Sequence, residues 1–163
     1  MIKKKIVMLG SWGVGKTSLV RQFVENVFED KYLSTLGVKV DTKQVQVDGK
    51  EIKLMLWDIA GAEDNFSVPM NYLKGAAGCL LVVDGTRKES LQTALELKTL
   101  VEKEIGALPF VVAANKSDLQ WQLSNADLED AFPKPTDRWF STSAKTGQNV
   151  EALFQEMAER VNA

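Results

Sequence analysis

The chain has 163 residues, of which 45% are apolar and 26% charged, a composition typical of one soluble folded domain with a substantial core. Twenty basic residues against twenty-two acidic ones give a formal net charge of −2, so nucleic acid is not expected as a partner. Histidine is absent, which excludes Ser-His-Asp and Cys-His catalysis and histidine metal sites.

In chain order, apolar segments that look buried on both faces alternate with segments of helical period. This alternation is typical of a parallel sheet covered by helices. It predicts a strand at 5–9, a helix beginning near Thr17, a strand at 79–84, a helix over 90–104, a strand at 109–115, a helix over 124–131, a strand at 139–143 and a helix from 149 to about 161. Cys79, the only cysteine, opens the second strand and is expected to be a buried structural thiol.

A different pattern occupies residues 38–58. Ile52, Leu54 and Leu56 are apolar at every second position, and Asp48-Gly49 stands where a tight turn would join two strands. We therefore expect an antiparallel β-hairpin here. No repeat or linker interrupts the chain, so residues 1–163 are expected to form a single domain.

Membrane and targeting signals are not seen in the sequence. No apolar run approaches the roughly 18 residues of a membrane span, and three lysines follow Met1-Ile2 where a signal peptide would have its apolar core. The last residues, ERVNA, lack the cysteine that a prenyl anchor needs. These observations predict a cytoplasmic protein with no direct membrane anchor.

The strongest chemical signal is GSWGVGKT, from Gly10 to Thr17, at the junction of the first strand and the first helix. It matches the pattern of a phosphate-binding loop, in which glycines let successive backbone N–H groups face phosphate oxygens. The positive end of the helix adds to this attraction. Lys16 is then expected to neutralise the outer phosphates, and Thr17 to offer its hydroxyl to Mg²⁺.

A second motif, NKSD at 115–118, follows directly after an apolar strand. A carboxylate at Asp118 suits guanine, whose N1–H and exocyclic amine are two adjacent donors, whereas adenine presents an acceptor to one of the two oxygens. Alone the motif is weak, because an aspartate at this distance from an asparagine is commonly a cap or turn. Its position about a hundred residues after the phosphate loop strengthens the assignment. TSAKT at 142–146 follows the last strand.

Together these motifs resemble the Ras-like small GTPases, most closely the Rab-type branch, from about residue 4 to the last helix. The resemblance rests on GSWGVGKTSL, YLSTLGV at 32–38, LWDIAG at 56–61, YLKGAAGCLLVVD at 72–84, NKSD and SAKTG at 143–147. It implies an α/β fold, a P-loop three-layer sandwich with a six-stranded, mostly parallel sheet, one antiparallel edge strand and about five helices. The missing lipid anchor fits a bacterial or otherwise unlipidated member.

The resemblance also implies roles for individual residues, with GTP or GDP and Mg²⁺ as ligands. Phe28 would pack against the guanine, and Ala144 would donate its N–H to the guanine O6. Catalytic roles would fall to Lys16, Thr35 and Gly61. The metal would be held by Thr17, Thr35 and Asp58. The nucleotide-binding set is Gly13, Val14, Gly15, Lys16, Thr17, Ser18, Phe28, Thr35, Gly61, Asn115, Lys116, Asp118, Ser143, Ala144 and Lys145.

Loss of the γ-phosphate would release Thr35 and Gly61 and relax the segments around them. Residues 30–38 and 60–73 would therefore bind protein effectors and regulators, both exchange and activating proteins, and the chain itself is expected to be a monomer. Apolar side chains gather in the second segment and favour an effector-binding patch over a purely internal packing role. They are Phe66, Val68, Met70, Tyr72 and Leu73.

Two positions depart from the family pattern. Ala62 stands where the family has a glutamine that orients the attacking water, and alanine cannot form that hydrogen bond. Carboxylates at Glu63 or Asp64 are poor substitutes, because they add negative charge near the γ-phosphate. Trp12 replaces a small residue of the loop; its indole lies outward over the nucleotide or, as we favour, obstructs an arginine supplied by an activating protein.

The sequence thus predicts a guanine-nucleotide-binding switch with slow intrinsic GTP hydrolysis. The alternative is a pseudo-GTPase, a scaffold that keeps its nucleotide and performs no useful hydrolysis. An ATP-using P-loop kinase is disfavoured, because NKSD points to guanine and no arginine-rich lid is visible.

Overall fold

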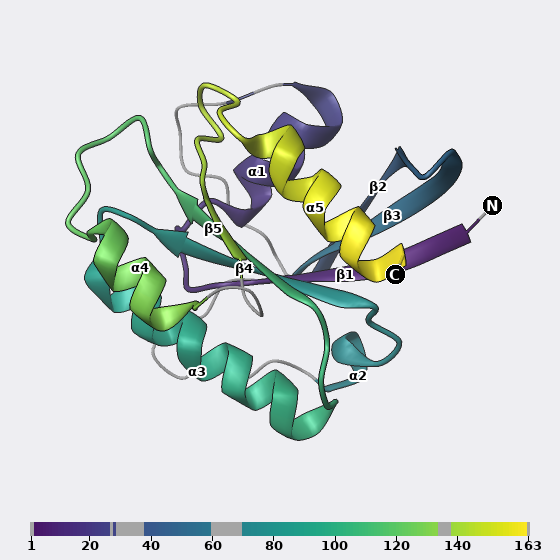
Figure 1. Ribbon diagram of the computed structural model, residues 1–163, viewed down its shortest axis with the longest axis horizontal. Coiled ribbons are helices and arrows are strands. Elements are labelled where there is room, and N and C mark those ends of the chain that lie inside the picture. Colours follow the sequence, from purple (N-terminus) through teal and green to yellow (C-terminus); the bar gives the residue numbers. More distant parts are fainter. Residues whose placement is uncertain (1, 27, 29–37, 60–69, 134–137, 163) are drawn as a thin grey trace.

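The computed structural model describes residues 2–26, 28, 38–59, 70–133 and 138–162 (Figure 1). Within these residues, strands and helices follow one another in the predicted order, with one short helix at 70–73 that the apolar pattern did not predict. They are β1 (Ile2–Leu9), α1 (Lys16–Glu25), β2 (Val38–Val47), β3 (Lys50–Ile59), α2 (Met70–Leu73), β4 (Gly78–Asp84), α3 (Lys88–Glu104), β5 (Phe110–Asn115), α4 (Asn125–Ala131), β6 (Arg138–Ser141) and α5 (Val150–Asn162).

The strands form one six-stranded sheet in the order β2-β3-β1-β4-β5-β6. Among the described strands, only β2 and β3 pair antiparallel; the other neighbouring strands are parallel. Asp48 and Gly49 join β2 to β3 with φ angles of 51° and 76°, the left-handed conformation that a two-residue hairpin turn requires. The predicted hairpin and fold class are both confirmed.

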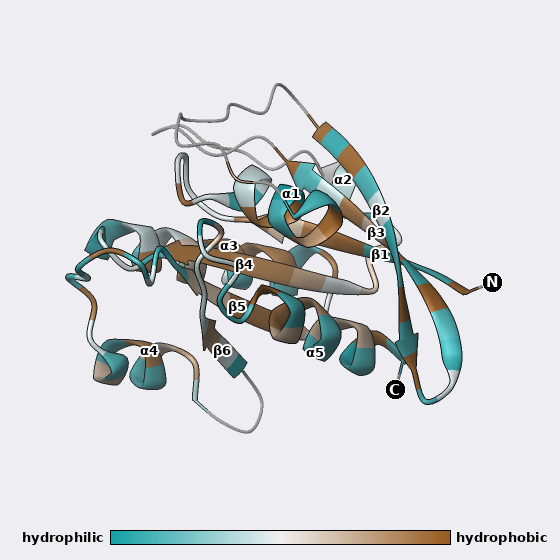
Figure 2. Ribbon diagram, turned by 90° about the horizontal axis from the view of Figure 1, so that it is seen from above, coloured by the Kyte–Doolittle hydropathy of each residue, from teal (hydrophilic) through white to brown (hydrophobic). Residues whose placement is uncertain are grey.

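Helices cover both faces of the sheet, which gives three layers (Figures 1 and 2). On one face α1 and α5 enclose a core in which the rings of Phe23 and Phe154 stack with centroids 4.1 Å apart. On the other face α3 and α4 cover a second core that includes Leu97 and Leu128. Each fully buried side chain of this size contributes about 1.5–3 kcal/mol relative to exposure, so the two cores fix the sheet firmly between the helices.

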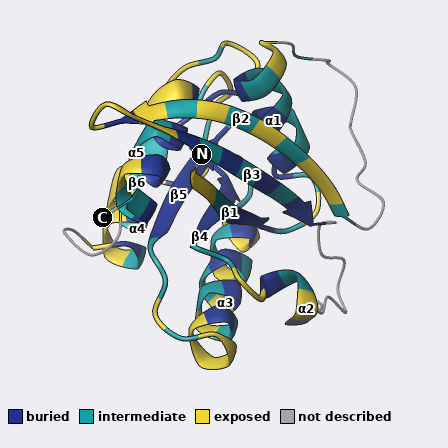
Figure 3. Ribbon diagram, turned by 90° about the vertical axis from the view of Figure 1, so that its right-hand side faces the viewer, coloured by how far each residue is buried: buried dark blue, intermediate teal, exposed yellow. Residues whose placement is uncertain are grey.

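The neighbouring strands β4 and β5 are buried along their whole length, whereas β2 at the edge alternates for most of its length between exposed and partly buried residues (Figure 3). Cys79 lies in β4, where burial raises the pKa of its thiol. The prediction of a buried structural cysteine is therefore confirmed. Among the described helices, none has the length and apolarity to cross a membrane.

Two strand boundaries differ by two or more residues from the sequence-based prediction. β1 begins at Ile2 rather than near Lys5, because its first residues pair with β3, starting with Ile2 opposite Ile52. Lys3 and Lys4 in this part hide the strand from a search for apolar runs. β6 ends at Ser141, which leaves Thr142 in a loop.

The parallel strands place the candidate site. β1, β4, β5 and β6 end at Leu9, Asp84, Asn115 and Ser141, and the carboxyl ends of parallel strands meet at one edge of a sheet. This is the edge at which open α/β sheets bind their ligands.

Candidate nucleotide-binding site

The phosphate loop curls between β1 and α1, and glycines make its shape possible. Gly13 and Gly15 have φ angles of 76° and 105°, in the left-handed region that favours glycine. A Cβ at Gly15 would also lie 2.4 Å from Nδ2 of Asn115. The loop is therefore packed directly against the end of β5.

Lys16 opens α1 and folds its side chain back over this loop. Its Nζ donates to the Gly10 carbonyl at 3.1 Å and to the Ser11 carbonyl at 3.4 Å, and the residue is only 6% exposed. Burial lowers the pKa of Lys16 to about 8; the charge of Asp58 opposes this shift and that of Arg87 adds to it. A phosphate beside the ammonium would favour its protonated form.

Thr17 and Asp58 provide oxygen atoms next to Lys16. The Thr17 hydroxyl donates to Asp58 Oδ2 at 2.5 Å, and Asp58 is held in place by β3, where it pairs with Met8 of β1. Hydroxyl and carboxylate oxygens are ligands that Mg²⁺ prefers. Among the described residues, no group of three or more His, Cys, Asp or Glu side chains is placed to hold a metal ion.

Asn115 joins the phosphate loop to the loop after β6. Its Nδ2 donates to the Val14 carbonyl at 3.0 Å, while its Oδ1 accepts from the Thr142 hydroxyl at 3.1 Å and the Ala144 N–H at 3.3 Å. The residue is 2% exposed. Three segments far apart in sequence therefore meet at one side chain.

The rest of the base motif lies beside this junction. Ser143 donates its hydroxyl to Asp118 at 2.8 Å, which places the predicted guanine-binding carboxylate next to the loop of residues 143–146, called the SAKT loop below. Gln22 of α1 donates to the Ala144 carbonyl at 2.7 Å. Lys145 is exposed, and Phe28 is half-buried against the core under α1 and α5.

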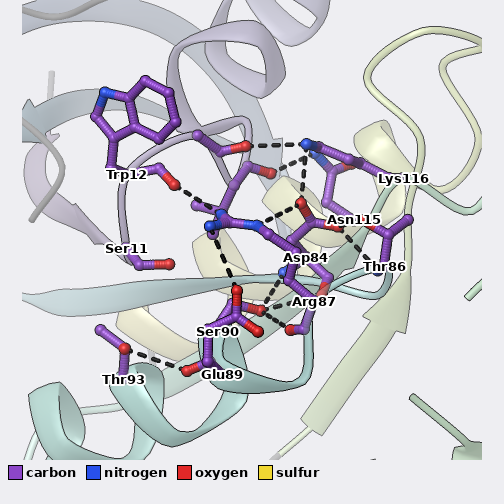
Figure 4. Close-up of polar contacts among 12 residues, drawn as sticks. Ser11, Trp12, Asp84, Thr86, Arg87, Glu89, Ser90, Thr93, Asn115 and Lys116 are labelled. Carbon is purple, nitrogen blue, oxygen red and sulfur yellow. Dashed lines mark hydrogen bonds and ion pairs between the residues drawn. The ribbon is translucent and has the colours of Figure 1, made fainter. Parts of the chain in front are cut away.

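Lys116 connects the base motif to the phosphate loop. Its ammonium donates to the Gly13 carbonyl at 2.9 Å and pairs with Asp84 at 2.9 Å (Figure 4). Burial alone would raise the pKa of Asp84, but hydrogen bonds from Lys116 and Thr86 outweigh it and hold that pKa below its ordinary value. Asp84 is thus an anionic anchor under the loop.

Sequence reasoning missed several residues of this site. Asp84 ends β4, and Thr86 and Arg87 follow it; none of the three was assigned to the site, although Arg87 donates to the Trp12 carbonyl at 2.6 Å. Trp121 was missed too; its indole N–H donates to the Lys116 carbonyl at 2.9 Å. The available signal was the position of Asp84 at the carboxyl end of a strand adjacent to β1.

Other predicted residues lie outside the described part of the chain. Of the predicted site and switch, these are Thr35, Gly61, Ala62, Glu63, Asp64, Phe66 and Val68, and the side chain of Met70. Trp12 is described and is 47% exposed, in line with an outward indole. Tyr72 is half-buried beside Trp57, with ring centroids 6.3 Å apart. Leu73 is 1% exposed and belongs to the core, so its assignment to an exposed effector patch was wrong.

Comparison with known proteins agrees with this geometry. The Ras family profile matches residues 5–163. The chain is 38% identical over 161 residues to Ras-related protein Rab11E of Lotus japonicus, covering 96% of this chain and 73% of the relative. It is 37% identical to human Ras-related protein Rab-4B and 33% identical to Ras-related protein SEC4 of Saccharomyces cerevisiae, covering 96% of this chain and 75% and 74% of these relatives. The chain therefore belongs to the Ras family of GTP-binding switch proteins, in its Rab branch.

Proposed function

We propose that this protein is a molecular switch that binds GTP and GDP with Mg²⁺ and hydrolyses GTP slowly. The observation that supports this most is the Asn115 junction, which brings the phosphate loop, the base motif and the SAKT loop to one edge of the sheet. A bound guanine nucleotide needs those three segments at once, its phosphates at the first and its base at the others.

In this proposal each part of the chain has one task. Backbone N–H groups of residues 13–18 and the Lys16 ammonium bind the phosphates. Asp118 accepts from the guanine ring nitrogen and amine, with Ala144 and Lys145 beside the base and Phe28 against its edge. Thr17, Asp58 and Thr35 hold Mg²⁺, which supplies positive charge to the phosphate oxygens.

Slow hydrolysis follows from residue 62. Phosphoryl transfer to water needs a group that positions the water, and the methyl of Ala62 cannot do so. Thr35 and Gly61 would contact the γ-phosphate. When it is present, the segments 30–38 and 60–73 would adopt the conformation that effectors and regulators bind. We further propose a cytoplasmic, monomeric protein in which residues 1–163 form one domain.

Base specificity is the direct test. Purified protein should carry GDP or GTP, identified by chromatography after denaturation, and should reject ATP in competition. Asp118→Asn should shift preference toward xanthine nucleotides, because the new amide donates where the carboxylate accepted. Asp130→Asn, which changes an exposed carboxylate on α4, is the matched control and should leave specificity unchanged. If ATP competes as well as GTP, the base assignment is wrong.

The pseudo-GTPase scaffold is the second candidate, and Ala62 is the observation that favours it. Single-turnover hydrolysis of bound GTP, with and without extract of the source cell, separates the two. Phosphate release that extract accelerates supports the switch. Bound GTP that persists under both conditions supports the scaffold.

A further inference from the structure

Arg87 lies between β4 and α3, and its side chain reaches the phosphate loop (Figure 4). The guanidinium uses two different nitrogens. Its Nε donates to Asp84 Oδ2 at 3.1 Å, and its Nη2 donates to the Trp12 carbonyl at 2.6 Å. On the outer side, Nη1 and a carboxylate oxygen of Glu89 are 3.9 Å apart. Because Asp84 is buried, the guanidinium is anchored at one end and holds the loop with the other.

Lys116 makes the corresponding link one residue further along the loop. Its ammonium contacts both Asp84 and the Gly13 carbonyl at 2.9 Å. One buried carboxylate therefore holds two cations, and these two cations hold two successive carbonyls of the loop, those of Trp12 and Gly13.

Fixing the Trp12 carbonyl also fixes the direction of the Gly13 N–H, because both belong to the same peptide unit. The peptide unit is planar and trans, so the Gly13 N–H points away from the Trp12 carbonyl and therefore away from Arg87. Gly13 itself has a φ of 76° and tolerates many backbone conformations. The hydrogen bond from Arg87 holds the Trp12 carbonyl and opposes rotation of this peptide. Arg87 lies close enough to provide that hold, since a Cβ at Gly13 would be 3.8 Å from its Nη2.

We infer that Arg87 is a positioning residue of the nucleotide site: by holding the Trp12 carbonyl it keeps the Gly13 N–H directed at the outer phosphates and slows nucleotide release. This inference rests on the proposed function. The guanidinium also lies near enough to Lys16 for its charge to act there, so it adds to the positive charge that the phosphates meet.

Arg87→Ala tests the inference, with Arg138→Ala as the matched control. Arg138 also forms an ion pair with a carboxylate, that of Glu156 at 3.1 Å. It lies at the start of β6, opposite Val111 near the start of β5, and therefore at the end of the strands away from the candidate site. The measurements are the dissociation rate of a fluorescent GDP analogue and the affinities for GDP and GMP. Arg87→Lys is a third variant, which keeps the charge but has a single nitrogen to share between Asp84 and Trp12.

A hydrogen bond from a charged donor corresponds to about a ten- to hundredfold change in an equilibrium constant. Arg87→Ala should therefore release GDP about tenfold faster and lower the ratio of GDP to GMP affinity by a similar factor. Arg87→Lys should be intermediate, and Arg138→Ala should match the unmodified protein. Should Arg87→Ala fail to fold, the intermediate ratio in Arg87→Lys supports the inference and an unchanged ratio overturns it.

Two results would overturn the positioning role of Arg87 and leave the proposed function intact. They are an unchanged GDP release rate in Arg87→Ala, and an equal loss of GMP and GDP affinity, which indicates a general loosening of the pocket. Failure of the unmodified protein to bind GDP at all would instead refute the proposed function itself.

Discussion

The side-chain amide of Asn115 donates to the Val14 carbonyl at 3.0 Å, across 101 residues of sequence. The same side chain accepts from Thr142 and Ala144, so it joins the phosphate loop, the end of β5 and the loop after β6. We therefore expect the stability of the fold and the affinity of this site for nucleotide to change together.

Asn115→Ala should show this coupling. The substitution leaves the Val14 carbonyl and two donors without their partner in a buried place, and each such loss costs about 1–3 kcal/mol. Unfolding by urea should occur at a lower midpoint, and GDP release should be at least tenfold faster. The control is Asn125→Ala at an exposed position of α4, which should change neither. If Asn115→Ala releases GDP as slowly as the unmodified protein, Asn115 does not position the segments of the site.

The indole of Trp121 should stabilise the base motif through a hydrogen bond to the backbone of Lys116. Lys116 has a left-handed φ of 70°, and its carbonyl accepts from Trp121 Nε1 at 2.9 Å. Trp121→Phe keeps an aromatic ring against Gly85 but removes this donor. Since such a hydrogen bond contributes about 0.5–1.5 kcal/mol, GDP release should accelerate about three- to tenfold.

Trp139→Phe is the matched control for this substitution. The Trp139 Nε1 is buried and has no hydrogen-bond partner among the described residues, so removing it should leave GDP release unchanged. Equal release rates in Trp121→Phe and Trp139→Phe would show that the indole N–H of Trp121 does not position Lys116.

Much of this site is predictable from sequence, because phosphate and guanine each demand a short local pattern. Lys16, Thr17 and Asp118 belong to such patterns, and strand ends bring them together. Arg87 and Trp121 belong to none. Their roles come from contacts that no motif encodes, that of Arg87 to Trp12 across 75 residues and that of Trp121 to Lys116 within one loop, and either residue type would be ordinary on a surface. Only the packing of α3 and of the loop after β5 reveals them.

The pKa of Lys16 predicts a pH dependence. Burial lowers it from 10.5 to about 8, so between these values the unfolded chain binds more protons than the folded one. The stability of the nucleotide-free protein should therefore rise with pH across this window, relative to Lys16→Met, in which the group is absent. Denaturation series from pH 7 to pH 10, at intervals of about half a unit, check this difference. A difference independent of pH would contradict the lowered pKa.

Nucleotide binding should show the opposite trend. A phosphate beside Lys16 favours its ammonium form, so binding above pH 8 takes up a proton and affinity for GDP should fall as pH rises. Calorimetry in two buffers of different ionisation enthalpy measures this proton uptake directly. Lys16→Met should bind GDP much more weakly and without the uptake, whereas equal uptake in both proteins would assign the proton to another group.

We expect residue 62 to limit the rate of GTP hydrolysis. The rate depends on positioned water and on stabilisation of the developing charge, and an arginine supplied by a partner is worth about 10³–10⁵ in rate. Without a water-positioning amide at Ala62, the intrinsic rate should be very low. Ala62→Gln should raise it several-fold, as measured by single-turnover phosphate release from the GTP complex. Ala62→Leu enlarges the side chain without adding an amide and should stay slow. If the unmodified protein already matches Ala62→Gln, another group orients the water, and the slow-switch proposal fails.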